Sequence, residues 1–189
     1  MHLLFGACAE GRDQLIPAFG MAAMTSSLSQ TTEEQLLTPT TLVMGVGNLL
    51  LGDDGAGIRA IERLAERDLP NNVNVIDAGT PGWGLPAWFD GQKKVIIIDA
   101  VHMGATPGAW KRFNPEAVRL FASGEVFSLH EPGLANGLAL AEALGNLPEE
   151  IVIYGIEPDQ CEIAQGLSPA IQQALDPLIE EIYAEIWNG

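Results

Sequence analysis

Two apolar segments with the character of buried strands flank one amphipathic helical segment in the first half of this chain. They are residues 41–46 (TLVMGV) and 73–78 (VNVIDA). Between them, from about Gly55, apolar residues recur with the period of an α-helix. The apolar face of this predicted helix consists of Ile58, Ile61, Leu64 and Ala65. A strand, a helix and a strand in this order predict a βαβ unit, whose two strands are parallel.

Later segments extend this unit into a larger sheet. Residues 94–100 (KVIIIDA) form a continuous apolar run, which is typical of a central parallel strand covered on both faces. Residues 151–156 (IVIYGI) predict another buried strand, and residues 109–113 (AWKRF) a short strand nearer an edge. Helices are predicted from about Gly133 to Gly145 and from Ser168 to about Trp187. The expected fold class is α/β, a three-layer α/β/α sandwich with a mixed, mostly parallel sheet of about five strands and helices on both faces.

The last predicted helix has a clear start and one internal irregularity. Pro169 suits the first helical position, because that position needs no amide donor. Pro177 lies in the middle of the segment and is expected to kink the helix or to restart it. One stripe of the helix is apolar and consists of Ile171, Leu175, Leu178, Ile182 and Ile186.

The first 40 residues differ from the rest. They are rich in Ser, Thr, Gln and small residues without a sustained period, so we expect a poorly ordered N-terminal extension at 1–40 and one α/β domain at 41–189. The chain has 189 residues, enough for a core without disulfides, and only two cysteines, as expected in a reducing compartment. The apolar start is a poor signal peptide and no run suits a membrane span. We therefore expect a cytoplasmic protein.

The charge balance is strongly acidic. The chain has 25 acidic and 9 basic residues, a formal net charge of −16, and no Lys or Arg after Arg119. Binding to nucleic acid needs a clustered basic face, so this class of partner is excluded. Two interpretations are left, a solvated acidic surface that keeps the protein soluble, or an acidic face that meets a basic or metal-bearing partner.

Acidic residues stand at the ends of three predicted strands. Asp53 and Asp54 follow the first strand, Asp77 ends the second, and Asp99 ends the third. In parallel sheets the carboxyl ends of the strands meet at one edge, where ligands bind. Clustered carboxylates there favour a cation or general acid–base chemistry.

A histidine would complete a site for a borderline transition metal. His102 lies three residues after Asp99, and His130 lies just before the helix expected to begin near Gly133. The spacing of these residues does not choose between the two histidines.

The glycine-rich loop after the first strand also invites comparison with nucleotide-binding turns. After Gly45 and Gly47, the position of the third fingerprint glycine is Leu50. The acidic pair would moreover repel a pyrophosphate at the helix N-terminus. Asp77 could still mimic the acidic residue that binds a ribose, so a Rossmann-like nucleotide-binding protein stays open as a less favoured alternative.

Five segments together resemble the hydrogenase maturation proteases, endopeptidases that trim the C-terminus of the large subunit of nickel-iron hydrogenases. The resemblance covers residues 41 to about 186. Its first block, Gly-x-Gly-Asn followed by an acidic pair and Gly, is specific, and the others add weight together. The five segments are VMGVGNLLLGDDGAGIRA (43–60), IDAGTPG (76–82), IIIDAVHMG (96–104), SLHEPGLANGLAL (128–140) and YGIEP (154–158).

The resemblance implies a peptidase domain at 41–189 and a metal site. Carried onto this chain, the ligands of the metal ion are Asp54, Asp99 and His130. The family accepts Glu or Asp at the first of these positions, and this chain has the shorter side chain. The implied cofactor is nickel, carried by the hydrogenase large-subunit precursor, so that cleavage checks that nickel has been inserted.

The same block suggests supporting residues. Asn48 belongs to its motif, and Gly45 and Gly47 are expected to let the backbone pass close to the partner. Asp53 is expected either to orient the ligands or the loop, or to stabilise the N-terminus of the following helix. A metal-binding assembly factor that holds the precursor without cutting it is the second alternative.

Overall fold

The computed structural model describes residues 40–116 and 134–188, so the extension expected at residues 1–40 falls almost wholly outside the described part. Its strands form one five-stranded sheet in the order β2-β1-β3-β5-β4. All neighbours are parallel except the edge strand β4, which runs antiparallel to β5. The mixed, mostly parallel sheet is therefore confirmed. The strands are β1 (Thr41–Val46), β2 (Val73–Gly79), β3 (Lys94–Ala100), β4 (Trp110–Phe113) and β5 (Glu150–Ile156).

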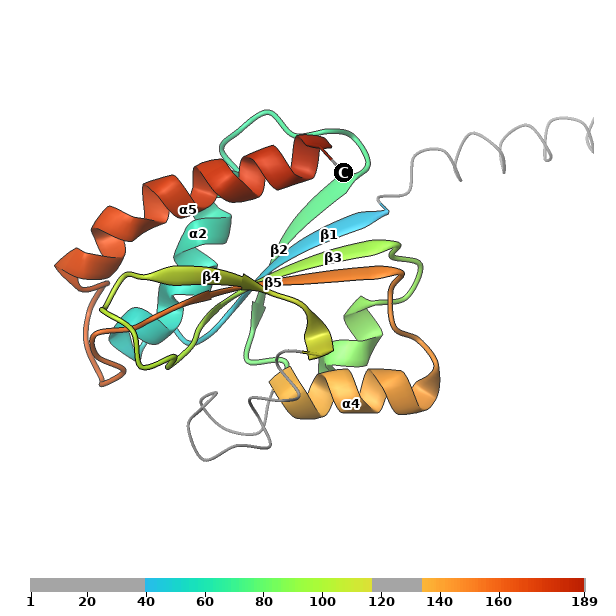
Figure 1. Ribbon diagram of the computed structural model, residues 1–189, viewed down its shortest axis with the longest axis horizontal. Coiled ribbons are helices and arrows are strands. Elements are labelled where there is room, and N and C mark those ends of the chain that lie inside the picture. The colour runs from blue at the N-terminus through green and yellow to red at the C-terminus, as the bar shows by residue number, and fades with distance from the viewer. Residues whose placement is uncertain (1–39, 117–133, 189) are drawn as a thin grey trace, which may run out of the picture. The chain divides into compact units, whose positions relative to one another are not determined.

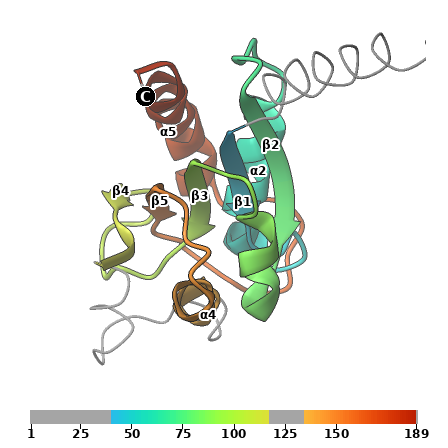
Figure 2. The same ribbon diagram turned by 90° about the vertical axis from the view of Figure 1, so that its right-hand side faces the viewer.

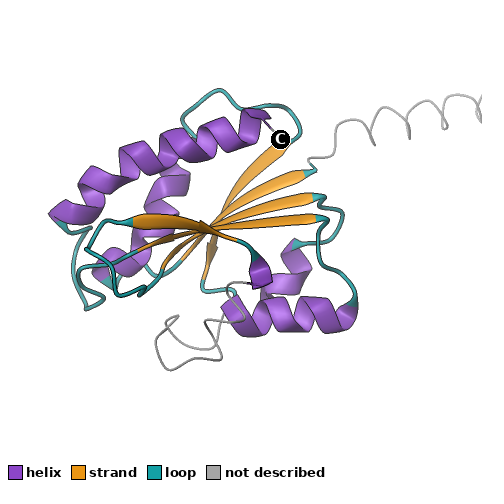
Figure 3. Ribbon diagram, in the orientation of Figure 1, coloured by secondary structure: helices purple, strands orange, loops and turns teal. Residues whose placement is uncertain are grey.

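Helices cover both faces of this sheet, which confirms the three-layer architecture. Helices α2 and α5 lie on one face, and η2 and α4 lie on the other (Figures 1 and 2). Figure 3 shows the strands in orange between helices in purple on both sides. The short 3-10 segment η1 connects β1 to α2. The helical elements are η1 (Gly52–Gly55), α2 (Ala56–Leu64), η2 (Gly82–Trp88), α4 (Leu134–Leu144) and α5 (Pro169–Asn188).

Successive residues of the central strands feed two separate cores. In β3, Ile96 and Ile98 belong to the core under α2 and α5, whereas Val95 and Ile97 belong to the core under η2 and α4. Side chains alternate between the faces of a strand, so Asp99 continues the series that faces α4. The strand thereby directs a carboxylate to the same face as α4.

The predicted apolar face of helix α2 extends one residue beyond the observed end of the helix. Ile58, Ile61 and Leu64 are buried as expected, but Ala65 is exposed. Ala65 follows the last helical residue, and its backbone N–H still donates to the Ile61 carbonyl. The prediction for Ala65 was therefore wrong, because a small residue at a helix end carries little information on burial.

Helix α5 is continuous through Pro177, so a restart at this proline is not observed. Pro177 and Gln173, whose carbonyl loses its amide donor, both lie on the exposed side of the helix. Water can therefore satisfy this carbonyl while the buried stripe holds the helix on the sheet. All five predicted stripe residues are buried: Ile171, Leu175, Leu178, Ile182 and Ile186.

The segment between β2 and β3 has no predicted element but forms η2. Leu85 and Phe89 from this segment are buried in the core under α4. Gly137 of α4 packs so closely on η2 that an added Cβ would lie 2.6 Å from the Gly82 carbonyl oxygen and from Leu85 Cβ. Short 3-10 segments have no long apolar period, which explains why the sequence pattern did not reveal this one.

No helix within residues 40–116 and 134–188 is both long and apolar enough to cross a membrane. The longest helix of the described residues, α5, has 20 residues but carries polar and acidic side chains along one side.

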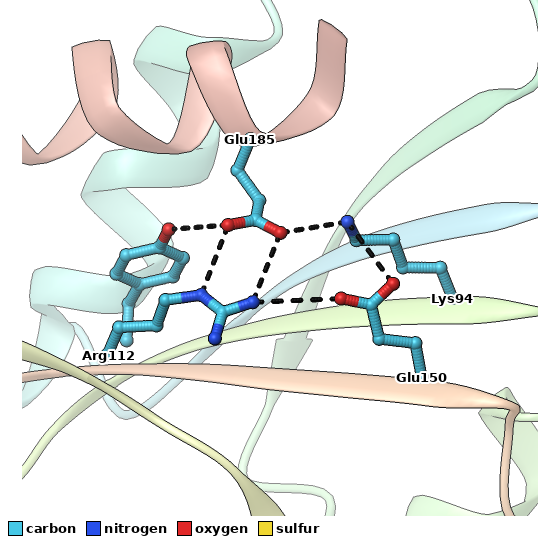
Figure 4. A network of polar contacts seen from close by, with 5 residues as sticks. Lys94, Arg112, Glu150 and Glu185 are labelled. Carbon is cyan, nitrogen blue, oxygen red and sulfur yellow. Dashed lines mark hydrogen bonds and ion pairs between the residues drawn. The ribbon is translucent and has the colours of Figure 1, made fainter. Parts of the chain in front are cut away.

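A charged network fastens the C-terminal half of α5 to the sheet (Figure 4). The Glu185 carboxylate accepts hydrogen bonds from Lys94 Nζ at 2.8 Å and from Arg112 Nε at 3.1 Å. The Tyr154 hydroxyl donates to the same carboxylate at 3.3 Å, and Glu150 pairs with both cations. Lys94 and Glu150 begin β3 and β5, so this network lies toward the amino ends of these strands.

Glu185→Gln is expected to lower the free energy of unfolding by about 1–2 kcal/mol at neutral pH. Burial of Glu185 opposes its ionisation, but hydrogen bonds and charges of Arg112 and Lys94 outweigh burial and lower its pKa to about 2. The stabilisation is therefore present above the ordinary pKa of 4.5 and is lost as the pH falls toward 2. Urea unfolding at several pH values measures this effect. The exposed Glu181→Gln on the same helix is the control and should change little.

Candidate active site

Two buried carboxylates, Asp54 and Asp99, occupy the carboxyl edge of the sheet. Asp54 lies in η1, the first element after β1, and Asp99 is the penultimate residue of β3. Strands β1 and β3 pair in parallel, so their carboxyl ends are neighbours. The exposed fractions of the two residues are only 6% and 8%. The sequence prediction that these strand ends meet is thus realised for this pair.

The negative charge of Asp54 affects the ionisation of Asp99. Burial and, after it, the negative charge of Asp54 raise the pKa of Asp99 to about 7, although the Ala100 N–H donates to the carboxylate and lowers it. Two like charges in a buried site favour protonation of one of them or the arrival of a cation. A metal ion would relieve this repulsion and release the proton.

Asp54→Asn is expected to lower the pKa of Asp99, which should nevertheless stay above its ordinary value of 3.8 because burial persists. Carboxyl ¹³C shifts followed through a pH titration of the metal-free protein measure this change. The folded-state pKa of Asp99 lies above the unfolded value, so its contribution to stability is fully present below about 4 and is lost as the pH rises to about 7. An unchanged midpoint for Asp99 in the variant would contradict the coupling.

Asp53, the neighbour of Asp54 in the sequence, fastens two loops together. Its Oδ2 accepts the backbone N–H groups of Asp159 and Gln160, at 2.9 and 3.2 Å. Its Oδ1 accepts the N–H of Ser168, the residue before α5, at 2.6 Å. Asp53 is completely buried, and no side-chain cap is found for η1 or α2. Of its two expected roles, the geometry matches orientation of the loop, and the helix whose N-terminus it meets is α5.

The glycines of the loop are required by packing inside the protein. A Cβ on Gly45 would collide with the Gly57 carbonyl and lie 2.6 Å from Ile61 Cγ1. Gly47 has a φ of 135°, and its Cβ would collide with the Asp54 carbonyl. Both glycines are buried, so they bring α2 and η1 close to β1. A partner was expected to pass close to these glycines, but in the structure the groups that lie against them belong to this chain itself.

Asn48 and Asp77, the two other predicted supporting residues, stabilise turns. Asn48 Oδ1 accepts the Leu50 N–H at 3.0 Å, and Asp77 Oδ1 accepts the Gly79 N–H at 2.8 Å. Such contacts between a short polar side chain and an amide two residues later are typical of Asx-turns. Asp77 is exposed at the carboxyl end of the edge strand β2. It therefore shares the sheet edge with Asp54 and Asp99, but not their burial.

Glu157 is a buried carboxylate that sequence reasoning missed. It follows β5, is 5% exposed, and accepts the N–H groups of Met103 and Ala105 at 2.6 and 3.0 Å. Its Oε1 also lies 3.4 Å from His102 Nδ1. Glu157 thereby fixes the loop that leaves β3 just after Asp99. Its position in the YGIEP segment was the available signal, because it too ends a buried strand.

The structure describes only one of the two candidate histidines. The structure places His102 beside Glu157, half exposed, in the loop after β3. His130 lies outside the described residues, between the described parts 40–116 and 134–188. Within those parts, no three His, Cys, Asp or Glu side chains form a group that could hold a metal ion. The described part therefore places the buried Asp54 and Asp99 at one edge of the sheet, and the proposed metal ligand His130 lies outside it.

Cys161 is a second residue near the pair that sequence reasoning did not single out. Burial and the negative charges of Asp54, Asp53 and Asp99 raise the pKa of its thiol to about 11, against a smaller effect of the Asp54 N–H. The thiol therefore stays protonated at neutral pH. It belongs to the loop between β5 and α5, which Asp53 holds against η1.

The sequence model of the hydrogenase maturation protease family matches residues 58–185 of this chain. The hydrogenase expression/formation protein HupD of Rhodobacter capsulatus is 35% identical over 147 residues, which cover 77% of this chain and 70% of that protein. The hydrogenase 2 maturation protease of Escherichia coli K12 is 33% identical over 147 residues, covering 77% and 89% of the two chains.

Solved structures show the same relationship. The hydrogenase maturating endopeptidase HybD from E. coli superposes with a TM-score of 0.71 at 32% identity, covering 78% of this chain and 92% of HybD. The hydrogenase maturation protease HybD from Thermococcus kodakarensis has a TM-score of 0.62 at 28% identity, covering 77% and 98%.

Proposed function

Because this chain belongs to the hydrogenase maturation protease family, we propose that it removes the C-terminal extension of a nickel-iron hydrogenase large-subunit precursor after nickel insertion. It is a maturation endopeptidase, an enzyme that hydrolyses peptide bonds. Its partner is then the precursor, with no role for nucleic acid or for membrane insertion, and its expected location is the cytoplasm. Nickel is the cargo of the substrate and not a resident ion of the enzyme.

The buried pair of Asp54 and Asp99 is the observation that supports this proposal most. A peptidase that recognises a nickel ion needs ligands already in place, and burial of Asp99 beside the negative charge of Asp54 favours either a proton on Asp99 or a cation at this position. His130 completes the proposed ligand set, which combines two oxygens with one imidazole, a combination suited to nickel.

The residues around the pair would hold it in position during cleavage. Asp53 fixes the loop that carries Asp54, and Glu157 fixes the chain that follows Asp99. Ligands held in this way lose little conformational freedom when the precursor binds. Nickel can act as a Lewis acid on a carbonyl or lower the pKa of bound water. The chain's own contribution is to engage that ion with fixed carboxylates.

Cleavage of the precursor separates this proposal from its alternatives. The protein is incubated with nickel-loaded precursor, and the large subunit is analysed by intact mass spectrometry. A protease shortens the precursor at one peptide bond, whereas a non-cleaving assembly factor forms a complex of unchanged mass. Saturable binding of a dinucleotide in a calorimetric titration, without cleavage, would instead favour the nucleotide-binding alternative.

A further inference from the structure

Two large apolar side chains are exposed next to the proposed site. Leu50 lies in the loop between β1 and η1, and 72% of it is exposed. Ile163 lies in the loop between β5 and α5, and 91% of it is exposed. The two loops adjoin, because the Ala164 N–H donates to the Leu50 carbonyl at 3.3 Å and Leu51 forms a parallel bridge with Ala164. Both apolar side chains therefore stand on adjoining loops at the carboxyl edge of the sheet.

The loops that carry these side chains are firmly held. Asp53 accepts N–H groups from Asp159, Gln160 and Ser168, and its own N–H donates to the Gln160 carbonyl at 3.1 Å. Leu50 and Ile163 are thus exposed although hydrogen bonds hold the backbone of the loops that carry them. Fixed, exposed apolar groups are suited to binding, because little conformational entropy is lost when a partner covers them.

The charge of this surface indicates what kind of partner fits. Residues 45–58 and 157–189 contain no Lys or Arg. Exposed Asp159 and Glu162 precede Ile163 in the same loop. An apolar contact bordered by acidic groups is complementary to an apolar side chain flanked by basic residues.

We propose that Leu50 and Ile163 form the docking surface for the precursor segment next to the scissile bond, and that this segment carries an apolar side chain flanked by Lys or Arg. The inference rests on the proposed function. It places this contact beside the chemistry, because Leu50 lies in the same short connection as Asp54. Binding energy from this contact is separate from the ligands of the metal ion.

Steady-state cleavage of nickel-loaded precursor tests the apolar contact. Leu50→Ser and Ile163→Ser are each expected to raise KM about tenfold and to leave kcat within about twofold, because they remove binding without touching the reacting atoms. Leu144→Ser and Trp187→Ser are matched controls, with 63% and 55% of the residue exposed. Trp187 follows Ser168 along α5 by about 28 Å, so it lies far from the site.

Ionic strength tests the charged part of the contact. Glu162→Gln is expected to raise KM about threefold at low salt, and this difference should vanish at high salt. Glu181→Gln, an exposed change of the same type in α5, should have no effect at either salt concentration.

The outcomes distinguish this inference from the proposed function. If the wild-type protein cuts the precursor but the two serine variants have the same KM as the wild type, the docking surface is refuted and the proposed function stands. The docking surface is also refuted if the two serine variants lower kcat at unchanged KM, or if the control variants raise KM by as much as they do. If the wild-type protein does not cut, the proposed function fails and the docking surface falls with it. A melting temperature within about 2 °C of wild type establishes that a variant is folded, because a surface substitution shifts it by only about this amount.

Discussion

Asp99→Asn is expected to lower the rate of precursor cleavage by about 10³-fold or more, with little change in melting temperature. Asparagine keeps the size of the side chain but removes the charge that would engage the nickel ion. Asp54→Asn and His130→Ala should have effects of the same order, because the three residues are proposed to share one ion. Single-turnover cleavage of nickel-loaded precursor measures the rates.

An exposed aspartate distant from the site provides the control for these variants. Asp90 lies in the loop before β3, at the opposite end of that strand from Asp99, and Asp90→Asn should cleave at the wild-type rate. Wild-type cleavage by Asp99→Asn, Asp54→Asn or His130→Ala would remove that residue from the proposed site. Equal losses in Asp90→Asn would instead indicate a general effect of reduced negative charge.

Asp53→Ala is expected to destabilise the protein by about 3 kcal/mol or more, which is among the largest effects of a single polar residue in this chain. The change leaves three backbone N–H groups without their acceptor, one of them at the buried start of α5. It should also reduce cleavage, because the loop that carries Asp54 loses its attachment. Chemical denaturation gives the free energy of unfolding.

Asp159→Ala is the matched control for this experiment. Asp159 is exposed, and it contacts Asp53 through its backbone N–H, which the substitution keeps. Its free energy of unfolding should stay within about 0.5 kcal/mol of wild type. The free energy of unfolding of Asp53→Asn should lie between those of the two alanine variants, because asparagine keeps one oxygen acceptor but turns an amide group toward backbone donors. Equal stability of Asp53→Ala and Asp159→Ala would contradict the role of Asp53.

The sheet and its long helices were predictable because their apolar patterns are strong. Residues 94–100 gave a central strand and the Ile171 to Ile186 stripe gave α5, and both are observed. Element η2 was missed, since a short 3-10 segment has no distinct period. The helix does not restart at Pro177, and the sequence pattern does not show that water can reach the carbonyl that the proline leaves unpaired.

The site was predictable only in part. Parallel strand ends meet at one edge, so the proximity of Asp54 and Asp99 followed from the sequence. The distinct role of Asp53 did not, because the partners of this residue are backbone amides more than 100 positions away along the chain. The contacts of Glu157 with the loop after β3 were not visible either, because they join backbone amides to a side chain more than 50 positions away. His130 was indicated by resemblance alone, and its place in the site stays a prediction.

The proposed enzyme recognises nickel that its substrate brings. Two carboxylates and one imidazole hold nickel weakly, so calorimetric titration of the free protein should show loose binding. Metal-free protein is then mixed with nickel-loaded and nickel-free precursor, at a chelator concentration that metal analysis shows to leave the loaded precursor intact. We expect that only the nickel-loaded precursor is shortened. Efficient cleavage of the nickel-free precursor in the presence of chelator would contradict it.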